Sequence, residues 1–323
     1  MIKSLSRGEV SEWFKEPVLK TGDAATHRGF ESHPLRQIAN SGAACGRLPL
    51  LLEWNDFLKG VFRLKIAFFD SGMGGLSVLH HARRVLPHEE FLFYADEAHV
   101  PYGTKTRAEV EAFVAEAFAF LVRQGVDAIV VACNTATSVA VPAMRARYDL
   151  PIIGMEPAAK KALALDGNRR VLVVATPITI AGAKLETLIE RVDKEHLVDR
   201  LALPELVTFA ERQEFDSPAV RAYLQRELAP YPLEAYSAIV LGCTHFNYFK
   251  AALREVVPPS VRFVDGNEGT VNELVRRLRA RGELAQAGTS ATTYYYSGRR
   301  VTAPQELARI ERYLRQLDRV YAL

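Results

Sequence analysis

Short apolar runs alternate with helical patterns along the chain from Leu64 onward. Buried parallel strands read as nearly continuous apolar runs, and their alternation with helices is typical of parallel βαβ units. We expect strands at 65–69, 91–94, 128–132, 152–154, 171–174, 238–241 and 262–264. The segment 107–124 predicts an amphipathic helix, because its apolar residues recur at a spacing of three or four. The pattern therefore indicates an α/β fold with open parallel sheets covered on both faces.

Two parts of the chain repeat each other. The segments 127–135 and 237–245 both read as a buried strand that ends in a cysteine and is followed by two polar residues. A weaker match places 65–72 beside 170–177 at nearly the same separation. An internal duplication explains both matches, so we expect two pseudo-symmetric doubly wound parallel-sheet domains. Ligands of such sheets bind outside the carboxyl ends of the strands, which predicts an active site in the cleft between the domains.

The repeat also sets the expected domain boundaries. We expect the first domain to comprise 63–155 plus 269–323, because the last helices cross back to the first half, and the second to comprise 156–268. The tyrosine run 294–296 could form an edge strand on either half. Residues 1–62 show no sustained periodicity, and we interpret them as a non-native or disordered extension in which Cys45 is a bystander.

Composition limits the classes of function. The chain of 323 residues is 49% hydrophobic, and 41 basic against 38 acidic residues leave a net charge of +3. Without a block of like charges, we expect no nucleic-acid partner. We expect no membrane association either, since no apolar run reaches the roughly 18 residues of a membrane span. Three widely spaced cysteines suit neither a disulfide framework nor a C-x-x-C pair, which favours a cytoplasmic protein.

Cys133 and Cys243 occupy equivalent places in the repeat. Inversion of an amino-acid α-carbon needs a base on one face and an acid on the other, and a thiolate and a thiol meet that need. The polar pairs that follow, 134–135 and 244–245, could open helices whose N–H groups lower the thiol pKa and bind an α-carboxylate. The two cysteines therefore suggest an acid/base pair for stereoinversion.

Other interpretations of these cysteines stay open. Each could be a small residue of a hydrophobic core. Cys243 could also bind zinc together with His245, or act as the nucleophile of a hydrolase with a histidine base. Three metal ligands with a defined spacing are not evident in the sequence, so we expect no metal site.

A glycine-rich turn at 72–77 follows the first expected strand, and Asp96 follows the next. The pair resembles part of a dinucleotide-binding fingerprint, but Ser77 stands where the third glycine would be. We therefore expect no nicotinamide cofactor. The glycines would instead let the backbone turn tightly and leave Asp70 and Ser71 exposed in the cleft.

Two further polar features follow expected strands. The turn 101–106 could present a hydroxyl and N–H groups, or be an ordinary surface loop. Glu156 precedes a proline suited to a first helical turn, so its carboxylate could cap a helix or face the cleft, where it would orient an ammonium group or His245.

The motifs of the chain form an ordered set between 65 and 265. They are Phe69-Asp70-Ser71-Gly72, Gly74-Gly75-Leu76-Ser77, Ala95-Asp96, Pro101-Tyr102-Gly103, Ala132-Cys133-Asn134-Thr135-Ala136, Met155-Glu156-Pro157-Ala158, Ala175-Thr176-Pro177 and Leu241-Gly242-Cys243-Thr244-His245. This set resembles the glutamate racemases of the aspartate/glutamate racemase superfamily. The resemblance covers nearly all of the body and none of 1–62.

The resemblance implies roles for individual residues. Cys133 and Cys243 would be the two acid/base residues, one for each enantiomer of glutamate. Asp70 would assist Cys133, and Glu156 and His245 would assist Cys243. Glutamate would be held by Asp70, Ser71, Tyr102, Gly103, Asn134, Thr135, Thr176, Thr244 and His245. No cofactor and no metal would be needed.

The resemblance further implies a homodimer that converts L-glutamate to D-glutamate for peptidoglycan synthesis. Two alternatives stay open. One is an aspartate or broad-specificity amino-acid racemase, since one methylene changes binding by only about 1–3 kcal/mol. The other is a non-catalytic binding or regulatory protein on the same fold, although such a protein would not need both thiols.

Overall fold

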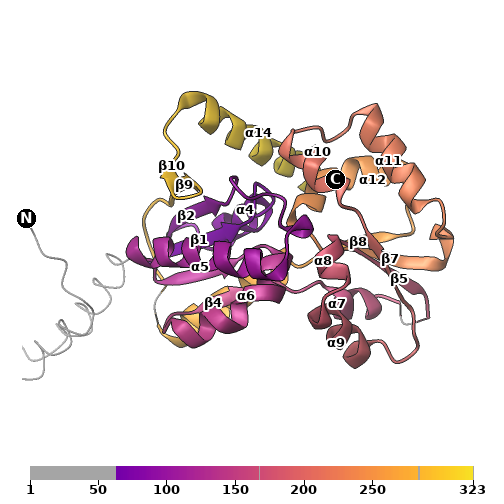
Figure 1. The fold of residues 1–323 in the computed structure, drawn as a ribbon, viewed down its shortest axis with the longest axis horizontal. Coiled ribbons are helices and arrows are strands. Elements are labelled where there is room, and N and C mark those ends of the chain that lie inside the picture. The colour runs from indigo at the N-terminus through magenta and orange to yellow at the C-terminus, as the bar shows by residue number, and fades with distance from the viewer. Residues whose placement is uncertain (1–62, 167, 283, 323) are drawn as a thin grey trace, which may run out of the picture. The chain divides into compact units, whose positions relative to one another are not determined.

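The computed structural model describes residues 63–166, 168–282 and 284–322 (Figure 1). The predicted extension 1–62, with Cys45, lies outside these residues. Two sheets carry the described fold. The first contains β1 (Lys65–Asp70), β2 (Glu90–Ala95), β3 (Ala128–Val131), β4 (Ile152–Gly154), β9 (Ala291–Tyr296) and β10 (Arg299–Arg300). The second contains β5 (Arg170–Ala175), β6 (Val198–Ala202), β7 (Tyr236–Leu241) and β8 (Arg262–Asp265).

Helices connect the strands, and we call the parts built on the two sheets the first and second lobes. The helices of the first lobe are α4 (Leu76–Val85), the 3-10 helix η1 (Tyr102–Thr104), α5 (Arg107–Arg123) and α6 (Asn134–Arg147). Those of the second are α7 (Ala159–Leu163), α8 (Pro177–Ile180), α9 (Ala183–Val192), α10 (Glu205–Glu211), α11 (Pro218–Leu228), η2 (Leu233–Ala235), η3 (Thr244–Phe249) and α12 (Lys250–Val256). After β8 come α13 (Asn267–Ala280), the β9–β10 hairpin and α14 (Pro304–Tyr321).

The two lobes share one topology. Among the described residues, the second sheet has the strand order β6-β5-β7-β8, and the first contains the equivalent order β2-β1-β3-β4. All neighbouring strands in these two sets are parallel. Cys133 follows β3 and Cys243 follows the equivalent strand β7. The predicted fold class, two similar parallel-sheet α/β halves, is therefore confirmed.

The β9–β10 hairpin extends the first sheet beyond the repeat. β9 is parallel to β2, with Ala291 opposite Glu90 and Tyr296 opposite Ala95, and β10 is antiparallel to β9. The tyrosine run 294–296 therefore lies in the first sheet and not in the second. The domain boundaries themselves stay predictions.

Both faces of each sheet are covered. On β1, Ile66 and Phe68 point into one hydrophobic core and Ala67 and Phe69 into another, as the alternation of strand side chains requires. Leu172 of β5 belongs to the same core as Ile66. One core thus runs from the first sheet to the second and packs the lobes together.

The predicted helix 107–124 is confirmed as α5. Thr106 Oγ1 accepts a hydrogen bond from the backbone N–H of Glu109, and Glu109 Oε2 accepts one from the N–H of Thr106 at 2.8 Å. This capping box satisfies N–H groups that have no partner within the helix. Val110 and Val114 lie on its buried side.

The chain passes between the lobes twice, at 155–158 and at Gly266. A Cβ atom at Gly266 would lie 2.8 Å from the carbonyl oxygen of Glu156. The absence of a side chain at Gly266 therefore lets the two crossings touch. None of the described helices is both long and apolar enough to span a membrane.

Candidate active site

Cys133 lies at the carboxyl end of β3 and begins α6. Its sulfur accepts a hydrogen bond from the N–H of Ala136 at 3.4 Å and donates to Ser71 Oγ at 3.6 Å. Ser71 follows β1, and its hydroxyl donates to Asp70 Oδ1 at 3.2 Å. Three of the predicted site residues therefore meet at the carboxyl ends of adjacent strands, where the fold class places ligands.

The environment of Cys133 favours the neutral thiol. The residue is buried, and burial raises the pKa of the thiol to about 12, with the nearby charge of Asp70 as the second cause. The charge of Cys243 contributes a further, smaller increase. At neutral pH, Cys133 holds a proton that it can donate.

Cys243 lies at the carboxyl end of β7, directly before η3. Its sulfur contacts His245 Nδ1 at 3.7 Å, and His245 Nε2 contacts Glu211 Oε1 at 2.6 Å. His245 is buried, which alone lowers the pKa of its imidazole, but the hydrogen bonds to Cys243 and Glu211 raise it well above the usual value. The high pKa favours the protonated imidazole, which faces the Cys243 sulfur.

A direct contact joins the two halves of this site. The hydroxyl of Thr244 donates to Asp70 Oδ2 at 2.8 Å, and the N–H of Gly72 donates to Asp70 Oδ1 at 3.0 Å. The Asp70 carboxyl is fully buried, and burial raises its pKa, although His245 and these hydrogen bonds act in the opposite direction. Asp70 thus contacts the residue after Cys243 directly and is linked to Cys133 through Ser71.

The glycine-rich turn lets the lobes approach each other. A Cβ atom at Gly74 would lie 2.4 Å from His245 Nδ1 and 2.5 Å from Thr244 Oγ1. At Gly72 it would lie 2.2 Å from Glu211 Oε1. Atoms of the second lobe therefore occupy the space that side chains at these positions would need. This close approach is a reason for glycine at positions 72 and 74 that does not involve a dinucleotide.

Three threonine hydroxyls form a buried cluster at the contact of the lobes. Thr135 Oγ1 of α6 lies 3.0 Å from Thr176 Oγ1 and 3.1 Å from Thr179 Oγ1, and the latter two lie 3.0 Å apart. Gly103 of η1 packs on the cluster, since a Cβ atom there would lie 2.8 Å from Thr176 Cβ. Thr179, one turn into α8, was missed in the sequence because only its spacing from Thr176 marks it.

Two predicted binding residues already have partners within the first lobe. The hydroxyl of Tyr102 donates to Asp96 Oδ2 at 2.6 Å, which holds η1 against the residue that follows β2. Asn134 donates through Nδ2 to Met155 Sδ at 3.3 Å, while its buried Oδ1 has no partner. Asn134 therefore keeps an acceptor without a partner in the residue directly after Cys133.

Glu156 does not lie where the prediction needs it. Its side chain is 55% exposed and pairs with Lys184 at 3.2 Å. The carboxylate beside His245 is Glu211, which ends α10 and carries no recognisable motif. The prediction that Glu156 assists Cys243 is therefore corrected, because the crossing between the lobes carries Glu156 to the surface.

The structure also bears on the rival interpretations. Asp96, a candidate ribose-binding acid, is buried, and its carboxylate accepts from Tyr102 and from Ser297 Oγ at 2.8 Å. It also contacts His99 Nδ1. Across the described ranges, no group of three or more His, Cys, Asp or Glu side chains could hold a metal ion.

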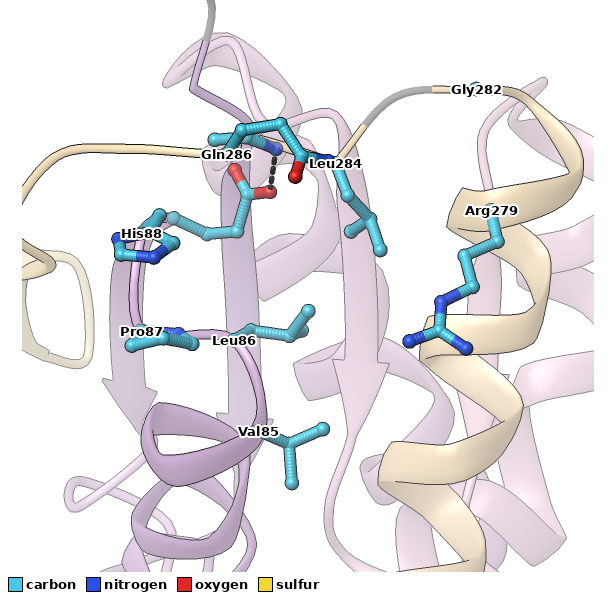
Figure 2. A pocket seen from close by; sticks show the side chains of 10 residues that line it. Val85, Leu86, Pro87, His88, Arg279, Gly282, Leu284 and Gln286 are labelled. Atoms are coloured by element: carbon cyan, nitrogen blue, oxygen red, sulfur yellow. Dashed lines mark hydrogen bonds between the residues drawn. The ribbon is translucent and has the colours of Figure 1, made fainter. Parts of the chain in front are cut away.

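A pocket of about 530 Å³ lies at the opposite, amino end of the first sheet (Figure 2). The residues that line it include Leu86, His88, Glu89 and Arg279. Glu89 accepts hydrogen bonds from the N–H groups of Leu64 and Ala285 at 2.7 and 2.8 Å. This pocket contains none of the predicted site residues, and Glu89 there ties two distant chain segments together.

Comparison with known proteins assigns the class of the chain. It belongs to the Asp/Glu/Hydantoin racemase family, whose model matches residues 77–274. A glutamate racemase of Campylobacter curvus is 54% identical to it over 263 residues, which make up 80% of this chain and 98% of the relative. The resemblance found in the sequence is thereby confirmed.

Solved structures agree with this assignment. Glutamate racemase from Thermus thermophilus, in complex with β-chloro-D-alanine, has 36% identity and a TM-score of 0.64, covering 78% of this chain and 93% of that one. Glutamate racemase from Francisella tularensis, in complex with D-glutamate, has 25% identity and a TM-score of 0.68, covering 79% and 94%.

Proposed function

We propose that this chain racemises glutamate without a cofactor, using Cys133 and Cys243 as the two acid/base residues. The observation that carries the proposal is that the two buried sulfurs have different neighbours. Cys133 is held as a thiol, whereas Cys243 faces a protonated His245. One group ready to donate a proton and one ready to accept it are what a two-base racemisation requires.

The reaction balances with these groups alone. The Cys243 thiolate takes the α-proton, so that an S–H bond forms, the Cα–H bond breaks and the electron pair stays on Cα. The Cys133 thiol then gives its proton to the opposite face of Cα and becomes a thiolate. The reverse reaction exchanges the roles, and no net proton is gained or lost.

The surroundings of the sulfurs suit an amino acid with a second carboxylate. N–H groups at the start of α6 can bind the α-carboxylate, whose charge grows as the carbanion forms. The hydroxyls of Thr135, Thr176 and Thr179 can donate to the side-chain carboxylate, and Asn134 Oδ1 can accept from the ammonium group. The complex of the Francisella tularensis relative with D-glutamate supports glutamate as the substrate.

The proposed product suggests a place in metabolism. D-Glutamate would supply peptidoglycan synthesis, as the resemblance to glutamate racemases implies. The homodimer and the cytoplasmic location expected from the sequence stay predictions.

The test follows L-glutamate and D-glutamate separately by circular dichroism in D₂O, with no added cofactor. Both signals should decay while deuterium enters the α-position. Cys133→Ala and Cys243→Ala should each abolish the decay, whereas Cys45→Ala, the matched control, should leave it intact. An unchanged signal with folded wild-type protein would refute glutamate as the substrate, and aspartate would be tested next.

A further inference from the structure

Arg309 of α14 joins one carboxylate from each lobe. Its Nη1 contacts Glu97 Oε1 at 2.5 Å, just after β2, and its Nη2 contacts Glu211 Oε2 at 3.1 Å. The side chain of Arg309 is 26% exposed, and those of Glu97 and Glu211 are 23% and 15% exposed. Solvent therefore screens these charges less than it screens surface pairs.

The same helix also fixes the backbone around Glu211. The hydroxyl of Tyr313 donates to the carbonyl oxygens of Ala210 and Glu211 at 2.9 and 3.2 Å. Gln213 Nε2 donates to the carbonyl oxygen of Arg309 at 3.0 Å. The C-terminal end of α10 is thus held against α14 by a side chain of α14, Tyr313, and by a side chain that follows α10, Gln213.

The two oxygens of Glu211 have different partners. Oε2 binds Arg309, whereas Oε1 contacts His245 Nε2 at 2.6 Å and accepts from the N–H of Met73 at 2.8 Å. A continuous line of contacts therefore runs from the Cys243 sulfur through His245 and Glu211 to Arg309.

We propose that Arg309 is a positioning residue for the racemisation. Arg309 holds Glu211 Oε2 and thereby keeps Glu211 Oε1 within hydrogen-bond distance of His245. Because Arg309 also pairs with Glu97, the position of Glu211 depends on the contact with the first lobe. Arg309 acts through Glu211 and does not touch the substrate. This inference rests on the proposed function.

The charges around Glu211 explain why a cation is needed there. His245 faces it from η3, Arg309 and Tyr313 from α14, Glu97 from the segment after β2, and Asp70 from β1. Glu97 and Asp70 are acids, so their charges oppose ionisation of Glu211. Burial also raises the pKa of Glu211, and the contacts with His245, Met73 and Arg309 lower it by more. Loss of Arg309 would raise the Glu211 pKa and weaken the support of a protonated His245.

The test compares Arg309→Ala with Arg312→Ala. Arg312 lies one turn further along α14, is exposed, and donates only to Gln213 Oε1 at 2.7 Å among the contacts described. For Arg309→Ala we expect kcat to fall by roughly tenfold or more, with little change in KM. We also expect the acidic limb of the pH profile to move to higher pH, because the Glu211 pKa rises. Each unit of that rise lowers the rate on the acidic limb about tenfold. Arg312→Ala should match the wild type.

Two further variants separate positioning from folding. Arg309→Lys keeps the charge but loses the planar fork, so we expect its rate and pH profile to lie between those of the wild type and Arg309→Ala. In a Glu211→Gln background, Arg309→Ala should cause no further loss, because the residue through which it acts is already neutral.

A crystal structure of Arg309→Ala gives a readout that does not depend on activity. We expect Glu211 Oε1 to move out of hydrogen-bond distance from His245. The proposal would be overturned if Arg309→Ala kept the wild-type rate and pH profile. It would also be overturned if Arg309→Ala lowered the rate as much in the Glu211→Gln background as in the wild type. If the wild type does not racemise glutamate, the proposed function fails, while the position of Glu211 in the variant still decides the role of Arg309.

Discussion

The hydroxyl of Thr244 donates to Asp70 Oδ2 at 2.8 Å and thereby connects the two lobes within the active site. Thr244 directly follows Cys243, and Asp70 is linked through Ser71 to the sulfur of Cys133. One buried carboxyl group therefore lies between the two proposed acid/base residues. Its charge adds to the high pKa of the Cys133 thiol, after the larger effect of burial.

The position of Glu211 predicts a large effect of Glu211→Gln. An amide keeps the shape of the side chain but cannot support a protonated His245, so we expect racemisation to slow by about 10²- to 10⁴-fold. Glu156→Gln is the matched control, and it should stay close to the wild-type rate because Glu156 is exposed and pairs with Lys184. Steady-state measurement of kcat and KM for both variants tests this prediction. The reverse ranking would show that Glu156 is the functional acid.

The high pKa of Cys133 predicts slow alkylation by iodoacetamide at pH 8. With a pKa of about 12, only about one Cys133 in ten thousand is a thiolate at that pH. Its labelling rate should rise about tenfold per pH unit up to roughly pH 11. Asp70→Asn removes a negative charge that disfavours the thiolate, so the pKa should fall and labelling should accelerate.

Mass spectrometry of the two cysteine peptides measures both rates in one sample. Cys243 serves as the internal reference, because the two residues are similarly buried, at 6% and 7% exposure. A Cys133 labelling rate that neither rises with pH nor accelerates in Asp70→Asn would contradict the high pKa of this thiol.

The hydroxyl cluster predicts a defect in substrate binding for Thr179→Val. Valine keeps the volume but removes a donor for the side-chain carboxylate, so KM should rise by roughly tenfold with a smaller change in kcat. Thr187→Val, on the exposed side of α9, is the matched control and should not change KM. An unchanged KM in Thr179→Val would remove Thr179 from the binding site.

The close approach at Gly74 predicts that Gly74→Ala inactivates the enzyme. The added methyl group would displace His245, and a shift of about 1 Å in such a site lowers the rate by roughly 100-fold. Gly269→Ala is the control, since no atom lies within 4 Å of its Cβ position and the residue lies in α13. That variant should stay active and gain about 0.5–1 kcal/mol in the free energy of unfolding. Full activity of Gly74→Ala would show that the lobes separate more widely in solution.

Sequence patterns predicted most of the fold because buried strands leave a clear signal. Both strands that end in a cysteine, β3 and β7, are fully buried and read as apolar runs. β6, Val198–Ala202, was missed because it lies at the edge of the second sheet and carries two adjacent charged residues, Asp199 and Arg200. None of its residues is fully buried, so the strand leaves no continuous apolar run.

The site was predicted where its residues follow strands, and missed where they come from helices. Cys133, Cys243 and Asp70 stand next to strand ends, and parallel strands bring such ends together. Glu211 ends a short helix, and its approach to His245 depends on the contacts of α10 with η3 and with side chains of α14. No local pattern encodes such a contact, whereas Glu156 follows a strand and was expected in its place.

The place of α14 in the chain has a consequence for synthesis on the ribosome. Both cysteines emerge long before Arg309, and β9, which borders β2, emerges only after the whole second lobe. Domains fold as units while the chain is made, so the second lobe can fold before the first sheet is complete. A nascent chain therefore carries both thiols before Arg309 exists to anchor Glu211, and proton transfer at full rate begins only after the last helix has left the ribosome.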